Sequence, residues 1–80
     1  MKRDRYEVTN EMLKIARKGC RKTEMMYRGY INYDMLNRYS KDMLENGLLV
    51  REGKRFKTSQ KGLEFMRSFQ NTKRLSGISI

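Results

Sequence analysis

The 80-residue sequence contains no histidine and a single cysteine, and both scarcities narrow the functions open to it. Histidine is the commonest general acid or base, and clusters of histidine, cysteine and carboxylate residues are the usual metal ligands. The chain also lacks a glycine-rich phosphate-binding loop. Asp34 and Asp42 occur on one predicted helix and are interpreted as surface charges rather than a catalytic pair. We therefore expect no enzyme activity, no metal and no cofactor, and no small-molecule ligand is evident.

Cys20 has no second cysteine to pair with, so no internal disulfide can stabilise the fold. A free thiol suits a reducing cytoplasm. An apolar run of membrane-spanning length is also missing, and the start of the chain lacks the apolar segment of a signal peptide. We expect one soluble, cytoplasmic domain over residues 1–80, with an ordered core over 4–75 and a frayed tail over 76–80.

Acidic residues are few relative to basic ones. Nineteen Lys and Arg residues stand against nine Asp and Glu residues, which gives a net charge of +10. Residues 1–22 carry eight basic and three acidic side chains, residues 23–50 three and four, and residues 51–80 eight and two. A charge that served solubility alone would be spread more evenly, so this distribution favours a polyanionic partner such as nucleic acid. Small thermophilic proteins are often rich in charge, which keeps a purely solvating role open.

The first third of the chain predicts two helices. Asp4 and Glu7 form a capping-box pattern, and apolar residues then recur at helical spacing until Gly19. The segment 20–22 could add a short strand. Thr23 can cap a second helix over residues 24–28.

The second helix and the turn after it complete this part of the chain. Its adjacent bulky residues, 25–27, are expected in the core. The turn over 29–31, where Tyr30 can be exposed, has the length of the link in a helix-turn-helix.

The next helix has the clearest ends of any predicted element. Asn32 can accept hydrogen bonds as its N-cap, and Gly47 can supply the left-handed residue that closes it. Leu48 then falls where a Schellman cap would fold it back on Met43. Helical phase predicts an apolar face of Met35, Leu36, Tyr39 and Met43. The opposite, polar face carries Asp34, Asn37, Arg38, Lys41, Asp42 and Glu45.

A hairpin and a last helix are predicted after this. The strands cover residues 48–50 and 55–58, the turn is placed at Glu52–Gly53, and Leu49 and Phe56 are expected to pack against the helices. Thr58 or Ser59 can cap the last helix.

The apolar arc of that last helix is wide. Leu63, Phe65, Met66 and Phe69 cover roughly 160°, more than one small core needs. We therefore expect Phe65, Met66 and Phe69 to form an interface with a second copy of the chain. The apolar pattern ends after Lys73.

Taken in order, these motifs resemble the archaeal winged-helix group that includes small DNA-binding chromatin proteins. The resemblance covers about residues 4–69 and rests on the order and spacing of several short motifs. They are Lys22-Thr23, Met26-Tyr27, Tyr33, Arg38-Tyr39, Leu48-Leu49, Glu52-Gly53-Lys54 and the segment Thr58 to Gly62. It implies a mainly α, winged helix-turn-helix fold (α-α-α-β-β-α), binding to double-stranded DNA, and homodimerisation through the last helix. The pattern of this last helix leaves open a shorter dimer contact, or none. Such a protein would be cytoplasmic and associated with the nucleoid.

In a helix-turn-helix the second helix enters the major groove while other elements hold phosphates. The residues expected at base edges or near the start of that helix are Tyr33, Asp34, Asn37, Arg38 and Lys41. The acidic residues nearby weaken the helix as an electrostatic anchor, so affinity is expected from cations on the wing and its approaches. These phosphate-binding candidates are Lys22, Arg28, Arg51, Lys54, Arg55 and Lys57.

Three other functions stay open. A winged helix can serve as a protein-protein interaction module, in which case DNA binding would be weak and insensitive to salt. RNA binding follows from charge alone, although the exposed aromatic sheet expected for stacking on single strands is missing. Only the basic helices favour binding to a membrane surface, and their apolar faces are needed for the core. The sequence names no target site or effector.

Overall fold

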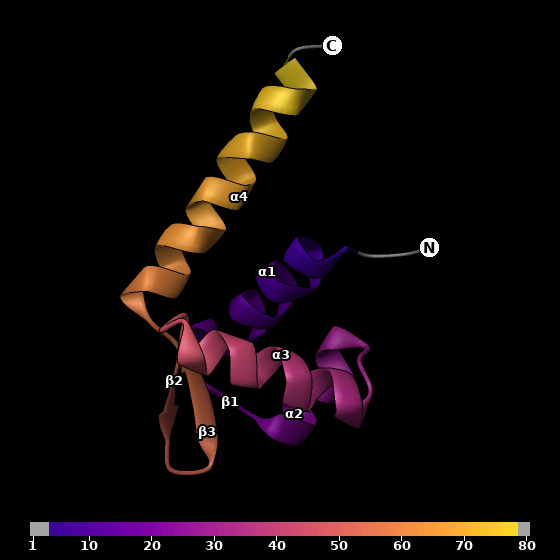
Figure 1. Ribbon diagram of the computed structural model, residues 1–80, viewed down its shortest axis with the longest axis vertical. Helices are drawn as coiled ribbons and strands as arrows, with labels where there is room; N and C mark the ends of the chain where they lie inside the picture. Colours follow the sequence, from indigo (N-terminus) through magenta and orange to yellow (C-terminus); the bar gives the residue numbers. More distant parts are fainter. Residues whose placement is uncertain (1–3, 79–80) are drawn as a thin grey trace.

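A computed structural model describes residues 4–78, with side chains described as far as Phe69, as four helices and a small sheet (Figure 1). In chain order the elements are α1 (Arg5–Ile15), a 3-10 turn (Ala16–Lys18), β1 (Cys20–Arg21), α2 (Lys22–Gly29), α3 (Tyr33–Glu45), β2 (Leu49–Glu52), β3 (Arg55–Thr58) and α4 (Gln60–Ile78). The strands form one antiparallel sheet in the order β1-β3-β2. The mainly helical fold class with a hairpin is confirmed, and the short extra strand after the first helix is present.

Both ends of α1 follow from local chemistry. The backbone N–H of Glu7 donates to the Asp4 carboxylate at 2.8 Å, which satisfies one of the free donors of the first turn. The α-helix ends at Ile15 and tightens into the 3-10 turn before Gly19, whose φ of 96° is readily adopted only by glycine. The predicted first helix is therefore confirmed with a 3-10 last turn.

The entry into α2 differs from the prediction. The helix begins at Lys22, and Arg21 at the N-cap makes no side-chain capping bond, so the expected Thr23 cap is wrong. The reason is that Arg21 still belongs to β1, where it pairs with Arg55, and the chain passes directly from strand to helix. Tyr27 was expected in the core but is 85% exposed, whereas Met25 is fully buried.

The turn after α2 carries an unusual residue. Gly29 stays helical and buried, where an added Cβ would lie 3.4 Å from Ile15 Cδ1. The left-handed position falls instead on Tyr30, whose φ is 53° and which is 89% exposed as anticipated. Gly29 therefore lies within α2, close to Ile15 of α1, and the left-handed conformation of the turn does not fall on it.

The caps of α3 are those that the sequence predicts. The Asn32 side chain accepts from the Met35 N–H at 2.8 Å. At the other end, the Leu48 N–H donates to Met43 O at 2.8 Å and the Gly47 N–H to Leu44 O at 3.2 Å, which is the Schellman pair. Gly47 adopts the required positive φ of 76°. These bonds fix where α3 stops and where β2 begins.

The hairpin, which we call the wing, turns one residue later than expected. Glu52 pairs with Arg55, so the two turn residues are Gly53 and Lys54 rather than Glu52 and Gly53. Gly53 takes a positive φ of 62°, as two-residue hairpins require of a turn position. The later turn extends the wing and brings Lys54 to its tip.

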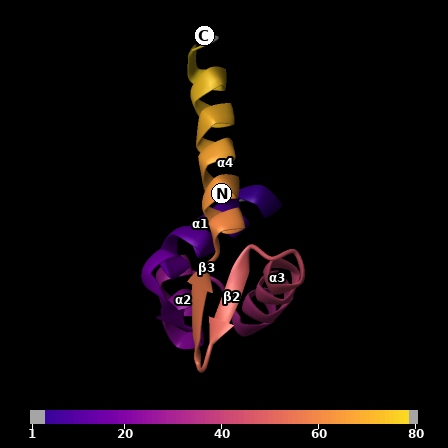
Figure 2. The ribbon, with the colours of Figure 1, turned by 90° about the vertical axis from the view of Figure 1, so that its left-hand side faces the viewer.

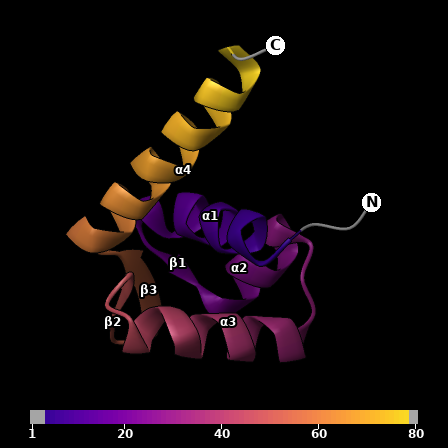
Figure 3. The same cartoon turned by 45° about the horizontal axis from the view of Figure 1, so that its top comes forward.

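The core lies where α1, α2, α3 and the sheet meet. Figure 3 shows the wing at one end of α3 and the α2–α3 turn at the other. Leu49 and Phe56 are each 2% exposed, which confirms that the wing packs its apolar face on the helices. Over residues 4–69, the buried apolar residues are Val8, Met12, Leu13, Ala16, Cys20, Met25, Ile31, Leu36, Met43, Leu49, Phe56 and Met66.

The last helix leaves the body of the molecule. Ser59 caps α4, because its hydroxyl oxygen accepts from the Gly62 N–H at 3.0 Å, whereas the Thr58 hydroxyl donates to the buried Leu13 carbonyl at 2.6 Å. α4 starts against α1 and then rises away from the other elements (Figures 1 and 2). It continues to Ile78, past the expected change at Lys73, because the end of an apolar stripe marks the end of a buried face rather than of a helix. Residues 79–80 of the expected tail lie outside the described residues.

Candidate functional site

The polar face of α3 is presented to solvent as the helical phase predicts. Tyr33, Asp34, Arg38 and Lys41 are exposed, and Asn37 is half-buried. Beneath them, Leu36 and Met43 anchor the opposite face in the core. The helix is therefore held by its apolar side and offers a row of polar groups to a partner.

The two edges of this polar face differ in their surroundings. On one edge Arg5 Nη2 donates to Asp42 Oδ2 at 2.7 Å, and Arg38 lines the same hollow of about 220 Å³. Asn37 and Lys41 lie about 100° away around the helix, on the other edge. Arg5 partly neutralises an acidic residue of α3, a role that sequence reasoning missed because 37 positions separate the two.

The pleat of the wing divides its cations between two sides of the sheet. Arg51 lies opposite Phe56, so both side chains project to the core-facing side, and Arg51 Cζ is 5.8 Å from the centre of the Phe56 ring. Arg55 and Lys57 flank Phe56 in β3 and therefore project to the other side. Lys54 lies in the turn between them. The four wing cations predicted as one group are thus divided.

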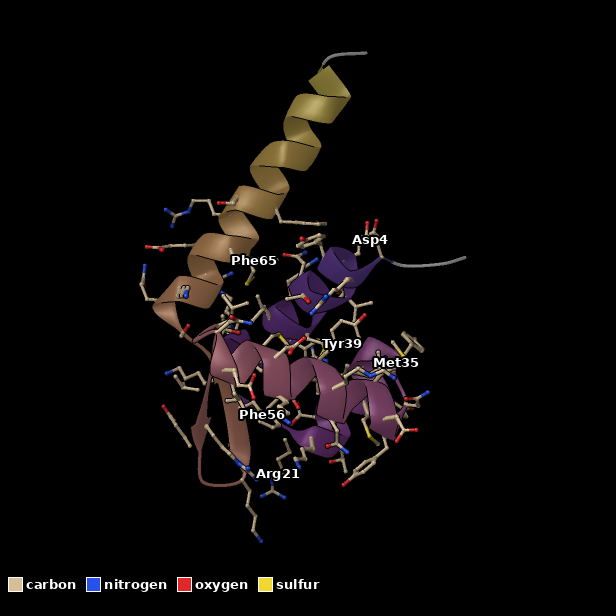
Figure 4. The ribbon with its side chains drawn as sticks, viewed as in Figure 1. Asp4, Arg21, Met35, Tyr39, Phe56 and Phe65 are labelled. Atoms are coloured by element: carbon tan, nitrogen blue, oxygen red, sulfur yellow. The ribbon has the colours of Figure 1, made fainter. Side chains whose placement is uncertain are left out.

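Arg51 and Lys54 meet a second set of basic residues at the start of α2. A groove of about 340 Å³ is lined by Arg21, Lys22, Thr23, Arg51 and Lys54, and we call it the basic groove. Figure 4 places Arg21 beside the wing, below α3. Sequence reasoning missed Arg21, although the neighbouring pair Arg21-Lys22 ahead of a helix was a visible signal.

Arg28 stands apart from this groove. It lies in the last turn of α2 and forms an ion pair with Glu24 at 3.8 Å between Nη1 and Oε2. Both side chains are about half exposed, so the pair contributes little to stability. The structure therefore brings together three of the six predicted phosphate-binding residues, Lys22, Arg51 and Lys54, and leaves Arg28, Arg55 and Lys57 outside the group.

A different surface follows the contact between α1 and α4. Tyr6 and Phe65 stack with ring centroids 6.5 Å apart and planes at 24°. With Asp4, Ser68 and Phe69 they line a hollow of about 330 Å³, which we call the α1–α4 groove. Met66 is only 8% exposed and packs in the core of its own chain, so it has little surface left for a partner.

Cys20 is buried in β1, and its chemistry agrees with a structural role. Burial, reinforced by the nearby Glu24 carboxylate, raises the pKa of the Cys20 thiol to about 11. The thiol is neutral at physiological pH and is a poor nucleophile. Over residues 4–78, no three His, Cys, Asp or Glu side chains are grouped closely enough to hold a metal ion. No helix in that part of the chain combines the length and the apolar character needed to cross a bilayer.

Two helices joined by a tight turn, followed by a hairpin that borders the second of them, define a winged helix-turn-helix. The winged helix-turn-helix family model matches residues 2–77, and the chain belongs to this family. Membership of a non-enzymatic family agrees with the expectation that the chain is not an enzyme.

Among solved structures, the crystal structure of Sso10a-2, a DNA-binding protein from Sulfolobus solfataricus, has the same fold. It superposes with a TM-score of 0.81 at 20% sequence identity, and the match covers 94% of this chain and 83% of that one. No curated protein matches the sequence. The expected winged-helix fold and the likeness to an archaeal protein of this group are confirmed.

Proposed function

We propose that the chain binds double-stranded DNA, with α3 in the major groove and the wing on the phosphate backbone. The observation that carries the proposal is the position of the wing, which contacts α3 through β2 and lines the basic groove with Arg51 and Lys54. A helix that can read base edges then lies next to cations that can hold phosphates, as specific binding requires. The family and the DNA-binding role of Sso10a-2 support the same function.

Competition between nucleic acids tests the choice of partner. A labelled random duplex of about 20 base pairs should be displaced by unlabelled duplex DNA much better than by double-stranded or single-stranded RNA of equal length. The wide, open major groove of B-form DNA admits a helix, whereas the deep, narrow major groove of RNA does not. Equal displacement by RNA would contradict the proposed placement of α3.

Arg38 is proposed to read bases. It is exposed in the middle of α3, and a guanidinium can bind both O6 and N7 of guanine. We expect Arg38→Ala to change the preference among duplex sequences by about tenfold while total affinity for random DNA falls less. Selection of bound sequences from a random pool, by the wild type and the variant, measures both quantities. Equal losses on selected and random duplexes would assign Arg38 to phosphate binding instead.

A homodimer is proposed as the working form. The α1–α4 groove presents Phe65 and Phe69 beside Tyr6, and α4 continues past the groove without another element of the chain beside it over residues 70–78 (Figures 1 and 3). The α4 of a second copy would bury these aromatic side chains and the outer part of the helix. Of the three residues predicted for this contact, Phe65 and Phe69 are proposed to take part directly and Met66 only as support from within the core.

The biological role that we infer is that of an archaeal transcriptional regulator or chromatin-type protein, placed with the nucleoid in the cytoplasm. The second candidate is a protein-protein interaction module. It is favoured by the exposure of Tyr27 and Tyr30, 85% and 89%, on the α2 side of the molecule. Tight binding of a protein partner to this side, together with weak and salt-insensitive binding to DNA, would select the second candidate.

A further inference from the structure

The residues that line the basic groove favour binding of an anion. Its lining contains four cationic side chains, one hydroxyl and no carboxylate. Arg21, Lys22 and Thr23 come from the β1–α2 junction, and Arg51 and Lys54 come from the wing, about 30 positions later in the chain. The fold therefore brings like charges together from two separate segments.

These cations are not compensated within the described part of the protein. Among the side chains described, those of residues 4–69, the ion pairs are Arg5–Asp42, Lys14–Glu11 and Arg28–Glu24, and none of them includes a lining residue. Glu24 follows the junction in α2 but is engaged with Arg28. Glu52, which like Arg21 pairs with Arg55, does not line the groove. Like charges in a concave surface repel one another and raise the local positive potential, and a bound anion relieves that repulsion.

We propose that the basic groove seats a single backbone phosphate of duplex DNA, gripped jointly by Arg21 and Arg51. The proposal rests on the DNA-binding function proposed above and adds to it one phosphate site with its ligands. Arg51 is held over the Phe56 ring, so its guanidinium is already partly ordered and loses less conformational entropy when it binds a phosphate. Guanidinium groups donate charge-assisted hydrogen bonds to phosphate, while Lys22 and Lys54 add positive potential and the Thr23 hydroxyl can donate.

This site would act as a clamp between two elements. A phosphate bound to both segments ties the wing to the start of α2, and so fixes the position of the duplex relative to α3. A contact of this kind sets register and strength without reading sequence. Arg21, which precedes the helix-turn-helix, thereby becomes part of the DNA surface.

The test replaces single phosphates of the duplex with uncharged methylphosphonates and measures the affinity of each duplex by fluorescence anisotropy. One high-affinity duplex, taken from a selected pool so that the register is fixed, is scanned position by position. For the wild type we expect at least one position where neutralisation weakens binding by about tenfold. Arg21→Ala and Arg51→Ala should each weaken binding to the unmodified duplex by a similar factor, and should show no further loss when that same phosphate is neutralised.

Arg17→Ala serves as the matched control, because Arg17 is an exposed arginine of the 3-10 turn and lies outside the groove. It should keep the full methylphosphonate effect. Thermal unfolding of each variant, followed by circular dichroism, shows whether the fold is retained, and Arg21→Lys and Arg51→Lys should recover part of the affinity.

The outcomes separate this site from the general function. The shared phosphate site is wrong if, for every methylphosphonate, the loss of affinity from Arg21→Ala or Arg51→Ala adds to the loss from the neutralised phosphate. It is also wrong if neither variant loses affinity. In both cases the DNA-binding proposal stands. If the wild type itself binds duplexes weakly and no neutralised phosphate matters, the DNA-binding proposal fails. A position coupled to both arginines is the result that supports the site.

Discussion

Replacing Gly62 with alanine should destabilise the protein by about 2 kcal/mol, although alanine favours a helix by about 1 kcal/mol over glycine. A Cβ at this position would lie 2.3 Å from Leu48 O and 2.6 Å from Thr58 Cγ2. Leu48 O is a backbone atom that already accepts the Ser59 N–H at 3.0 Å, so it cannot move away without breaking that hydrogen bond. Packing strain of roughly 1 to 3 kcal/mol or more then outweighs the gain in helix propensity.

Chemical or thermal unfolding monitored by circular dichroism measures this effect. A loss of about 2 kcal/mol corresponds to a melting temperature roughly 10 °C lower in a domain of this size. Lys61→Ala is the control, since Lys61 is exposed on the same first turn and its replacement should change stability by less than about 0.5 kcal/mol. Stabilisation by Gly62→Ala would mean that α4 does not sit on Leu48 as described.

The contact at Gly62 also matters for the site. Leu48 completes the C-terminal cap of α3 and precedes β2, so the first turn of α4 packs against the residue that connects α3 to the wing. A shift of α4 would therefore be transmitted to the elements that border the basic groove. We expect a Gly62→Ala protein that still folds to bind DNA more weakly without any change in its charged residues.

Replacing Phe69 with glutamine should convert the proposed dimer to a monomer at micromolar concentration and weaken DNA binding by about a hundredfold or more. In a two-fold contact each substitution counts twice, and losing a buried phenylalanine costs about 2 to 3 kcal/mol per copy. The dissociation constant of the dimer would rise by about a thousandfold or more. Two linked DNA-binding domains also gain affinity from proximity, and that gain disappears with the dimer.

Sedimentation or light scattering gives the mass, and a titration with a duplex long enough for two domains gives the affinity. Glu64→Gln is the control, because it places the same side chain on an exposed position of α4 outside the α1–α4 groove. It should leave the mass unchanged and should not weaken DNA binding, since it raises the net charge. A wild-type protein that is monomeric at high concentration would contradict the proposed contact.

Local signals in the sequence were sufficient to predict the ends of α3 and the side of the wing that packs on the core. Asn32 and Gly47 mark the ends of α3 through hydrogen bonds to residues close by, and those bonds are present in the structure. Leu49 and Phe56 identify the packed side of the wing because alternation along a strand fixes which side chains share a face.

Predictions of which side chains face the core failed where periodicity did not determine the buried face of a helix. α2 has eight residues, and two turns do not decide whether Met25 or Tyr27 faces the core. The wide apolar arc of α4 likewise could not separate Met66, which is buried in its own chain, from Phe65 and Phe69 at the groove. Both choices depend on how neighbouring elements pack rather than on periodicity.

The candidate site depends most on contacts between distant segments. The charge of the wing was visible in the sequence, but its division into two faces follows from the ladder that pairs Arg51 with Phe56. The approach of Arg21 to Lys54, and of Arg5 to Asp42, is set by the sheet and by the packing of α1. Neither pair has a signature in local sequence.

Binding of the wild-type protein to a random duplex over a salt series is the most direct test of whether the wing and the basic groove hold DNA. We expect the logarithm of the binding constant to fall linearly with the logarithm of salt concentration, with a slope that corresponds to several released counterions. Arg21→Ala and Arg51→Ala should each reduce that slope by about one, because each removes a phosphate contact. Weak binding that does not change with salt would contradict a DNA surface built on the wing and the basic groove.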